Sequence, residues 1–270
     1  MPQVAIADGE IHYEVTGQGD PLILVSGLSV VARHWQPQLA AFAARYKVVT
    51  YDQRGTGASD HRQREFSLDQ MARELALLMD ALKIERAHIV GLSTGGAIGQ
   101  TLAIEQPARV AGLALCSTWT HCDPWFRRLF EARRRMYELC GPELHAMFHP
   151  LFLYPPDYVN AHDAEITEEQ LHAPAKSAPV EASIGRVNAL LAFDRRAGLA
   201  RIKSPTLVMG CDNDYITPSY HSEALARAIP GAKLVMLRGG GHSFSKTRPA
   251  DFNRTVLDFL GAVDGKGGHA

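Results

Sequence analysis

Gly91-Leu92-Ser93-Thr94-Gly95-Gly96 follows the apolar run Ala87-His88-Ile89-Val90 and opens a helix-like stretch. A serine between two glycines at a strand-to-helix junction is typical of a nucleophile elbow. The flanking glycines allow a sharp backbone turn without a Cβ clash, so that the serine hydroxyl is held exposed above the edge of a sheet. The helix that follows directs its N-terminal N–H groups and positive dipole end toward the same point. This junction therefore indicates Ser93 as a nucleophile.

The segments on either side of the junction predict an α/β fold. Short apolar runs without alternation are typical of strands covered on both faces, and helical segments separate most of them. Asp8-Gly9 suits the tight turn of an N-terminal antiparallel hairpin, and Ser67 is expected to cap a helix with one apolar face. We expect a mostly parallel eight-stranded sheet flanked by helices. The expected strands are 4–6, 11–15, 21–25, 47–51, 87–90, 110–116, 206–210 and 233–237.

The segment 119–201 interrupts this rhythm, because it is rich in charge, aromatic residues and proline, with helix-like pieces around 126–140 and 183–193. We interpret it as a helical lid inserted after the sixth strand. The α/β core is then expected to comprise 1–118 and 202–264. A disordered tail is expected over 265–270.

Two later loops supply partners for the serine. A serine hydroxyl is a poor nucleophile at neutral pH, so it needs a base, and the base needs an orienting carboxylate. His242 lies in a glycine-rich loop after the strand 233–237 and is the candidate general base. Asp212 and Asp214 both follow the strand 206–210 and compete for the role of the acid, although Asx turns are common in such sequences. A serine, a later aspartate and a final histidine follow the chain order used by nucleophile-elbow hydrolases.

On these residues the whole chain resembles the α/β-hydrolases. Similar hydrolases place the acid four positions before a loop proline, and Pro218 then selects Asp214. The oxyanion that forms in acyl transfer needs two preorganised donors. The backbone N–H of Thr94 is expected to be one, and the resemblance selects Leu28 for the other. Family members often have His-Gly just before this position, whereas this chain has Ser26-Gly27.

Different parts of the chain resemble two different subfamilies of these hydrolases. The elbow together with Gly99-Gln100 and 107–110 resembles the 3-oxoadipate enol-lactonases, which open a small carboxylated lactone. The segments 26–28, 35–39, 51–57 and 150–155 resemble the aminoacrylate hydrolases of pyrimidine catabolism. Those hydrolases can lack the elbow serine, and the retained Ser93 favours cleavage of an ester, lactone or amide through an acyl-enzyme. In similar hydrolases the stretch 51–57 is a structural turn beneath the site, in which Asp52 and Arg54 tie loops together.

The lid contains residues that could recognise a substrate. The arginines of 127–135 are expected to form a solvated helix face, and the alternative is that one of them points inward to bind a substrate carboxylate. His145 and His149 have helical spacing without an acidic ligand pattern, which favours lid packing over a metal site. The candidate substrate-binding residues are Trp119, His121, Trp125, Phe152, Tyr154 and Arg186.

Composition excludes several other classes of protein. With 28 basic and 29 acidic residues the net charge is −1, so the sequence shows no footprint for nucleic acid or an anionic membrane. No segment approaches the roughly 18 uninterrupted apolar residues of a membrane span, and no secretory signal is visible, so a cytoplasmic protein is expected. The four cysteines lack the spacing of a zinc site. We expect neither a metal nor a cofactor, and either a monomer or a homodimer.

Together these features predict a cofactor-free serine hydrolase that acts on a small molecule, such as a carboxylated catabolic intermediate. Hydrolysis of a carbon–carbon bond and cofactor-free perhydrolysis use the same triad on this fold and remain alternatives. A different class of function is a ligand-binding protein that keeps a hydrolase pocket with little turnover.

Overall fold

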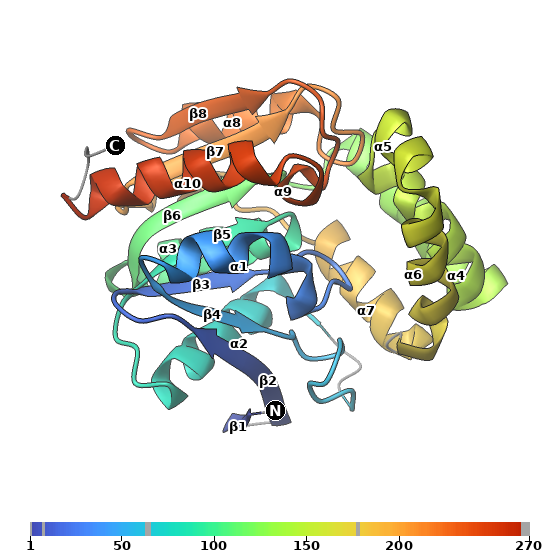
Figure 1. The fold of residues 1–270 in the computed structure, drawn as a ribbon, viewed down its shortest axis with the longest axis horizontal. Helices are drawn as coiled ribbons and strands as arrows, with labels where there is room; N and C mark the ends of the chain where they lie inside the picture. The colour runs from blue at the N-terminus through green and yellow to red at the C-terminus, as the bar shows by residue number, and fades with distance from the viewer. Residues whose placement is uncertain (1, 7–8, 63–65, 177–178, 266–270) are drawn as a thin grey trace.

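One mixed sheet forms the centre of the molecule (Figure 1). The computed structural model describes residues 2–6, 9–62, 66–176 and 179–265. Within them, eight strands follow the order β1-β2-β4-β3-β5-β6-β7-β8, which confirms the predicted fold class. The strands are β1 (Gln3–Ile6), β2 (Gly9–Thr16), β3 (Pro21–Val25), β4 (Lys47–Tyr51), β5 (Ala87–Leu92), β6 (Val110–Cys116), β7 (Thr206–Cys211) and β8 (Lys233–Leu237).

The sheet is antiparallel at one edge and parallel elsewhere. β1 pairs with β2, and β2 with β4, in antiparallel register, whereas β4, β3, β5, β6, β7 and β8 are joined by parallel pairings. The expected hairpin is therefore present, although Asp8 of its turn lies outside the described residues. Because parallel strands end at a common edge, the loops after β3, β5, β6, β7 and β8 are brought to one side of the molecule.

Helices cover both faces of the sheet (Figure 1). Alternate side chains of the central strands point into two separate apolar clusters, one shared with α2, α3 and α8 and the other with α1 and α10. Ser67 caps α2 as predicted, since its hydroxyl accepts a hydrogen bond from the Gln70 amide at 3.1 Å. The core helices are η1 (Ala32–Trp35), α1 (Gln36–Ala43), α2 (Leu68–Ala81), α3 (Thr94–Glu105), η2 (Pro107–Arg109), α8 (Ser219–Ala228), α9 (Phe244–Thr247) and α10 (Pro249–Val263).

A group of helices is inserted between β6 and β7. In Figure 1, α4, α5 and α6 stand together beyond one side of the sheet. The expected helical pieces are present, but the first is much longer than predicted and two further helices follow it. The inserted elements are α4 (Pro124–Leu153), α5 (Pro156–Ala161), α6 (Asp163–Lys176), α7 (Val180–Leu191) and η3 (Arg196–Arg201).

α4 consists of two helical segments that meet at a kink. Gly141 adopts φ 77° and ψ −176° inside it, and Pro142 follows. This backbone conformation is accessible essentially only to glycine, so the chain changes direction there. We refer to 119–201 as the lid, and its division from the core 1–118 and 202–264 stays a prediction. Of the expected tail, 266–270 lies outside the described residues, while the Gly265 amide bonds to the Ala262 carbonyl at 3.4 Å.

The described residues contain neither a membrane-spanning helix nor a metal-binding cluster. None of their helices is both long and apolar enough to cross a membrane. No group of three or more of their histidine, cysteine, aspartate or glutamate side chains is placed to hold a metal ion.

Candidate active site

Ser93 occupies a strained position between β5 and α3. Its backbone has φ 54° and ψ −115°, and its side chain makes no capping hydrogen bond to α3. The hydroxyl is therefore not used by the helix that begins beside it. A Cβ on Gly91 would overlap the Gly95 carbonyl, and one on Gly95 would overlap the carbonyl of Val25. The glycines are thus needed for close packing of the backbone, while the strain itself lies at Ser93.

Asp214 and His242 form a buried pair at the ends of β7 and β8. His242 Nδ1 lies 2.9 Å from Asp214 Oδ2 and 3.0 Å from Oδ1, and the two side chains are 4% and 0% exposed. Asp214 also accepts hydrogen bonds from the Ile216 amide and from the amide and hydroxyl of Thr217. Burial alone would raise the pKa of Asp214, but His242 and these hydrogen bonds lower it below its usual value.

This ionised acid determines which nitrogen of the imidazole carries its proton. A carboxylate can only accept hydrogen bonds, so His242 Nδ1 must be the donor to Asp214. In a neutral imidazole the other nitrogen, Nε2, then has a free lone pair. His242 is consequently prepared to accept a proton at Nε2.

The loop residues beside this pair fix the backbone around it. Gly239, Gly240 and Gly241 all have positive φ, of 69°, 119° and 69°. The Asp212 carboxylate accepts from the Gly239 amide at 2.8 Å, and Asn213 Oδ1 from the Gly241 amide at 2.9 Å. Asp212 therefore holds the glycine loop, whereas Asp214 holds the imidazole.

Hydrogen bonds at the end of β6 hold the serine and the histidine at the same edge of the sheet. The Cys116 carbonyl accepts from the Ser93 amide at 2.8 Å, and the hydroxyl of the next residue, Ser117, donates to the His242 carbonyl at 2.9 Å. Among the described residues, no hydrogen bond joins the Ser93 hydroxyl to His242. Catalytic hydrogen bonds are often long before substrate binds. Ser93 is 6% exposed and His242 3%, so both residues are buried.

The loop after β3 lies directly against Ser93. A Cβ on Gly27 would stand 3.4 Å from Ser93 Cβ and 3.9 Å from its hydroxyl oxygen. Leu28 follows and is 5% exposed. On the other side of the serine, Thr94 is the first residue of α3, whose first N–H groups have no acceptor within the helix. Of the expected oxyanion donors, Thr94 is therefore adjacent to the serine in sequence and Leu28 follows a residue that lies against it, and their roles stay predictions.

A network below the site connects this loop to the lid. Gln53 donates to the Ser26 carbonyl at 2.7 Å, and Trp35 donates to the Ser26 hydroxyl at 3.0 Å. The fully buried Arg186 of α7 donates to Gln53 Oε1 at 2.5 Å and to the Arg54 carbonyl at 2.9 Å. Arg186 therefore braces the lid against the core through two neutral acceptors. Gln53 has no sequence signal that would have predicted this contact.

The turn 51–57 makes the loop ties expected from the resemblance. Asp52 accepts from the amides of Ala32 and Ala58, at 2.7 and 2.9 Å. Arg54 forms a buried ion pair with Glu74 at 2.9 Å. The stretch therefore joins η1, α2 and the sheet.

The other candidate substrate-binding residues occupy different parts of the lid. Trp119 is fully buried beside Phe126, with ring centroids 4.5 Å apart, and its indole N–H has no partner among the described residues. Trp125 is 37% exposed and donates to the Tyr215 carbonyl. The remaining three are partly buried: His121 bonds to the Thr120 hydroxyl, Phe152 packs on the core, and Tyr154 lies under the Lys246 ammonium. Their roles in binding stay predictions.

The lid also contacts the loop that carries His242. The Ser243 amide donates to the Leu153 carbonyl at 3.1 Å. Lys246, in the following short helix α9, forms ion pairs with Glu169 at 2.9 Å and Glu165 at 3.5 Å in α6. The end of α4 and the middle of α6 are thereby bonded to the backbone and side chains next to the histidine.

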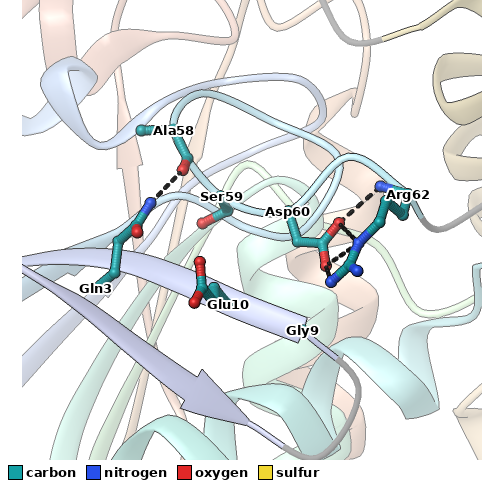
Figure 2. Close-up of a pocket in the computed structure, with 7 residues that line it drawn as sticks. All are labelled: Gln3, Gly9, Glu10, Ala58, Ser59, Asp60 and Arg62. Carbon is teal, nitrogen blue, oxygen red and sulfur yellow. Dashed lines mark hydrogen bonds and ion pairs between the residues drawn. The ribbon is translucent and has the colours of Figure 1, made fainter.

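Two surface pockets lie away from this site. One, of about 520 Å³, is bordered by Gln3, Glu10 and the ion pair of Asp60 with Arg62 (Figure 2). The other, of about 300 Å³, is lined by Ile104, Asp194, Arg195, Ala197, Gly198 and Arg201. Neither contains Ser93, Asp214 or His242.

The whole chain is similar to known hydrolases. A family model described as the alpha/beta hydrolase fold matches residues 20–249. Two proteins named carbamate hydrolase RutD are similar over nearly their whole length: that of Azorhizobium caulinodans is 38% identical, covering 98% of this chain and 100% of its own, and that of Variovorax paradoxus is 40% identical, covering 95% and 98%. The crystal structure of the enol-lactonase from Burkholderia xenovorans superimposes with a TM-score of 0.89 at 28% identity, covering 96% of this chain and 99% of its own.

Proposed function

The chain belongs to the alpha/beta hydrolase family, and on that premise we propose that it is a serine hydrolase that cleaves an ester, lactone or amide bond of a small molecule without a cofactor. The sequence predicts a resemblance to enol-lactonases and to hydrolases of pyrimidine catabolism, and it is confirmed by the enol-lactonase structure and by the relatives named RutD. The observation that carries the proposal is the strained Ser93, with its hydroxyl free of α3, at the same sheet edge as the buried pair of Asp214 and His242.

In the first half of the reaction the substrate acylates the serine. As Ser93 Oγ forms a bond to the carbonyl carbon, its proton passes to His242 Nε2 and the carbonyl π electrons move to the oxygen. Asp214 stabilises the resulting imidazolium through Nδ1. When the carbonyl reforms, the bond to the leaving oxygen or nitrogen breaks, and that atom takes the proton from His242. The acyl group remains on Ser93.

The second half repeats these steps with water. His242 accepts a proton from the water, whose oxygen attacks the acyl carbon, and the bond from that carbon to Ser93 Oγ breaks as the proton returns to Oγ. The products are a carboxylic acid and an alcohol or amine, whereas a lactone yields one hydroxy acid or its keto form. The backbone donors of Leu28 and Thr94 stabilise the oxyanion in both halves, and burial of the site strengthens their effect.

The names of the relatives are consistent with this range of substrates. A carbamate and an enol lactone both present a carbonyl carbon that is bonded to a heteroatom leaving group. The same nucleophile, base and oxyanion donors serve both reactions. The triad alone does not select between them, so selectivity depends on the residues that surround the bound substrate.

The test measures initial rates on a panel of short-chain esters, lactones, amides and carbamates. Ser93→Ala is expected to lower kcat/KM for the favoured substrate by about 10⁴-fold or more, since the nucleophile is lost. Asp214→Asn is expected to lower kcat by about 10³- to 10⁴-fold, because the imidazole loses its orienting acceptor. Asp212→Asn is the matched control two residues away, with an expected loss below about tenfold because it keeps an acceptor for the Gly239 amide.

Labelling with a fluorophosphonate gives a second readout that does not depend on the substrate chosen. The wild-type protein should be modified at Ser93, and Ser93→Ala should not. Hydrolysis that survives in Ser93→Ala would contradict the acyl-enzyme mechanism. Absence of both turnover and labelling would instead favour a ligand-binding role for the site.

A further inference from the structure

Arg133 does not share the solvent-exposed face expected for the arginines of α4. Arg127, Arg128 and Arg135 are exposed, whereas Arg133 is only 3% exposed. It lies on the buried stripe of the helix, and its guanidinium carbon is 4.9 Å from the centre of the Phe130 ring. A cation in this position has lost most of its hydration, which is costly unless another charge compensates for it.

No carboxylate within the described residues forms an ion pair with Arg133. Its Nη2 contacts His145 Nε2 at 3.3 Å, and its Nε–H has no hydrogen-bond partner. His145 is the neutral acceptor in that contact, because burial and the neighbouring Arg133 lower its pKa to about 3. The guanidinium therefore holds a full positive charge among uncharged groups.

The orphaned Nε–H of Arg133 lies on one edge of the planar guanidinium, and one N–H of Nη2 points in a nearly parallel direction along that edge. This pair of donors matches the two oxygens of a carboxylate in a bidentate arrangement. A bound carboxylate would satisfy the orphaned Nε–H and compensate the charge in one contact.

The surroundings of Arg133 connect it to both sides of the candidate active site. Tyr137, one turn further along α4, stacks on His145 with ring centroids 4.0 Å apart, and its hydroxyl lies beside those of Ser29 and Ser183. Ser29 follows the expected oxyanion donor Leu28. The cluster of Arg133, Tyr137 and His145 therefore stands on the lid next to the oxyanion loop.

His149 makes the connection toward the histidine of the triad. It lies one turn beyond His145, with ring centroids 5.3 Å apart. Burial, and then Arg133, His145 and His242, hold its pKa well below the usual value. His149 is thus within electrostatic reach of both the Arg133 cluster and His242.

We propose that Arg133 determines specificity by binding a carboxylate of the substrate beneath the lid, at a subsite formed across the kink of α4. The proposal rests on the proposed hydrolase function and assigns to one residue the selection of small acidic esters, lactones or amides over neutral ones. His145, beyond the kink, positions the guanidinium from the side. Substrate binding then completes the ion pair that the protein alone leaves unmade.

Arg186 does not fit this role as well, although it is also fully buried. Two of its nitrogens already donate to the Arg54 carbonyl and to Gln53. Its charge also interacts with Glu74, which tends to raise the pKa of Arg186 while burial lowers it to about 10. The Nε–H of Arg186 also lacks a partner, but both of its terminal nitrogens join the lid to the core, whereas Arg133 bonds only to His145 among the described residues.

The experiment compares one acidic and one neutral substrate of the same length. Monomethyl succinate and dimethyl succinate are hydrolysed by wild type, Arg133→Met, Arg133→Lys and the exposed control Arg135→Met. We expect the ratio of kcat/KM for the acidic over the neutral ester to fall by about 10- to 100-fold in Arg133→Met, the usual effect of a lost charged hydrogen bond. Arg133→Lys should fall between that variant and wild type, and Arg135→Met should keep the wild-type ratio.

Thermal unfolding supplies a readout that does not require turnover. Succinate should raise the Tm of wild type and of Arg135→Met but not that of Arg133→Met. Without ligand, Arg133→Met should unfold at the same or a higher temperature, since a buried unpaired charge is replaced by an apolar chain of similar length. A residue with a merely structural role would instead lower the Tm and reduce both hydrolysis rates by the same factor.

The outcomes separate this proposal from the hydrolase function. If wild type hydrolyses both esters and the ratio is unchanged in Arg133→Met, the carboxylate subsite is wrong while the hydrolase function stands. If wild type hydrolyses neither ester, the thermal shift with succinate decides the proposal by itself. If Arg133→Met does not fold, Arg133→Lys is tested in its place by the same kcat/KM ratio and the same thermal shift. Wild-type values of both quantities in Arg133→Lys would overturn the assignment.

Discussion

At the scale of single residues, the proposed nucleophile Ser93 has a strained backbone. Its φ of 54° and ψ of −115° are unfavourable for a side chain with a Cβ, and such conformations cost about 1–3 kcal/mol each. The surrounding backbone enforces it, because Gly91 and Gly95 permit contacts that leave no room for relaxation. Part of the stability of the fold is therefore used to present one hydroxyl.

This strain predicts opposite effects of Ser93→Gly on stability and activity. Glycine tolerates the backbone conformation, so the free energy of unfolding should rise by about 1 kcal/mol relative to Ser93→Ala, while both variants lose hydrolysis. Ser93→Ala is the matched control, since it removes the hydroxyl but keeps the Cβ. Urea unfolding of the two variants checks the prediction, and equal midpoints would show that the strain is absent in solution.

The residues of the expected triad were accessible to sequence reasoning because each follows a strand and sits among glycine, asparagine or proline. The choice of Asp214 over Asp212 needed a resemblance, since both occur in one short loop. Arg133 was not singled out, although Phe126, Phe130, Arg133 and Tyr137 recur at helical spacing. That stripe was a usable signal: an arginine at an apolar position of a periodic helix faces inward.

At the scale of elements, the strands were easier to predict than the lid. The central strands are apolar runs buried on both faces, and such a pattern depends on few neighbours. The lid helices are short or interrupted, and α6 carries several charged residues, so their periodicity is weak. The second half of α4 was missed because Gly141-Pro142 resembles a helix terminus. Beyond that point the helix is held by tertiary contacts, since Gln170 of α6 donates to the Ala146 and Met147 carbonyls.

The kink in α4 should therefore matter for activity as well as stability. It lies between Arg133 and His145, so straightening it would separate their side chains. Gly141→Ala places a Cβ at φ 77° and should cost about 1–2 kcal/mol, with a loss of kcat/KM on acidic substrates. Gly231→Ala is the control, because Gly231 has φ 71° and nothing within 4 Å of an added Cβ, but lies far along the chain before β8.

The two glycine variants are compared by urea unfolding and by steady-state kinetics. Gly231→Ala should lose a similar amount of stability and retain the wild-type kcat/KM. If both variants change activity alike, the effect of Gly141 is general destabilisation and the kink has no specific role.

At the scale of the whole molecule, buried neutral histidines should make the fold sensitive to acid. Burial and Arg133 lower the pKa of His145 to about 3 in the folded state. The unfolded chain binds a proton at this histidine below about pH 6.5. Between these values the unfolded state holds more protons, so the stability present at neutral pH is lost as the pH falls.

His145→Gln should weaken this dependence. Between pH 7.5 and 5.5, the free energy of unfolding of wild type should decrease by about 1.4 kcal/mol more than that of the variant. The reason is that His145 takes up a proton over this range in the unfolded chain but not in the folded protein. Urea unfolding at the two pH values measures the difference. Between pH 8.5 and 7.5 the free energy of unfolding should change equally in the two proteins. Equal losses of this free energy down to pH 5.5 would mean that His145 is charged in the folded state.

The bond between the Ser243 amide and the Leu153 carbonyl has a consequence for engineering this protein. It makes the last turn of α4 part of the scaffold of the histidine loop, although the two lie 90 residues apart in the chain. A lid grafted from another hydrolase would change the substrate range cleanly only if it supplied a carbonyl at the position of Leu153. A graft junction placed after Pro155 preserves that acceptor, whereas one placed within α4 makes the position of the proposed general base depend on the grafted lid.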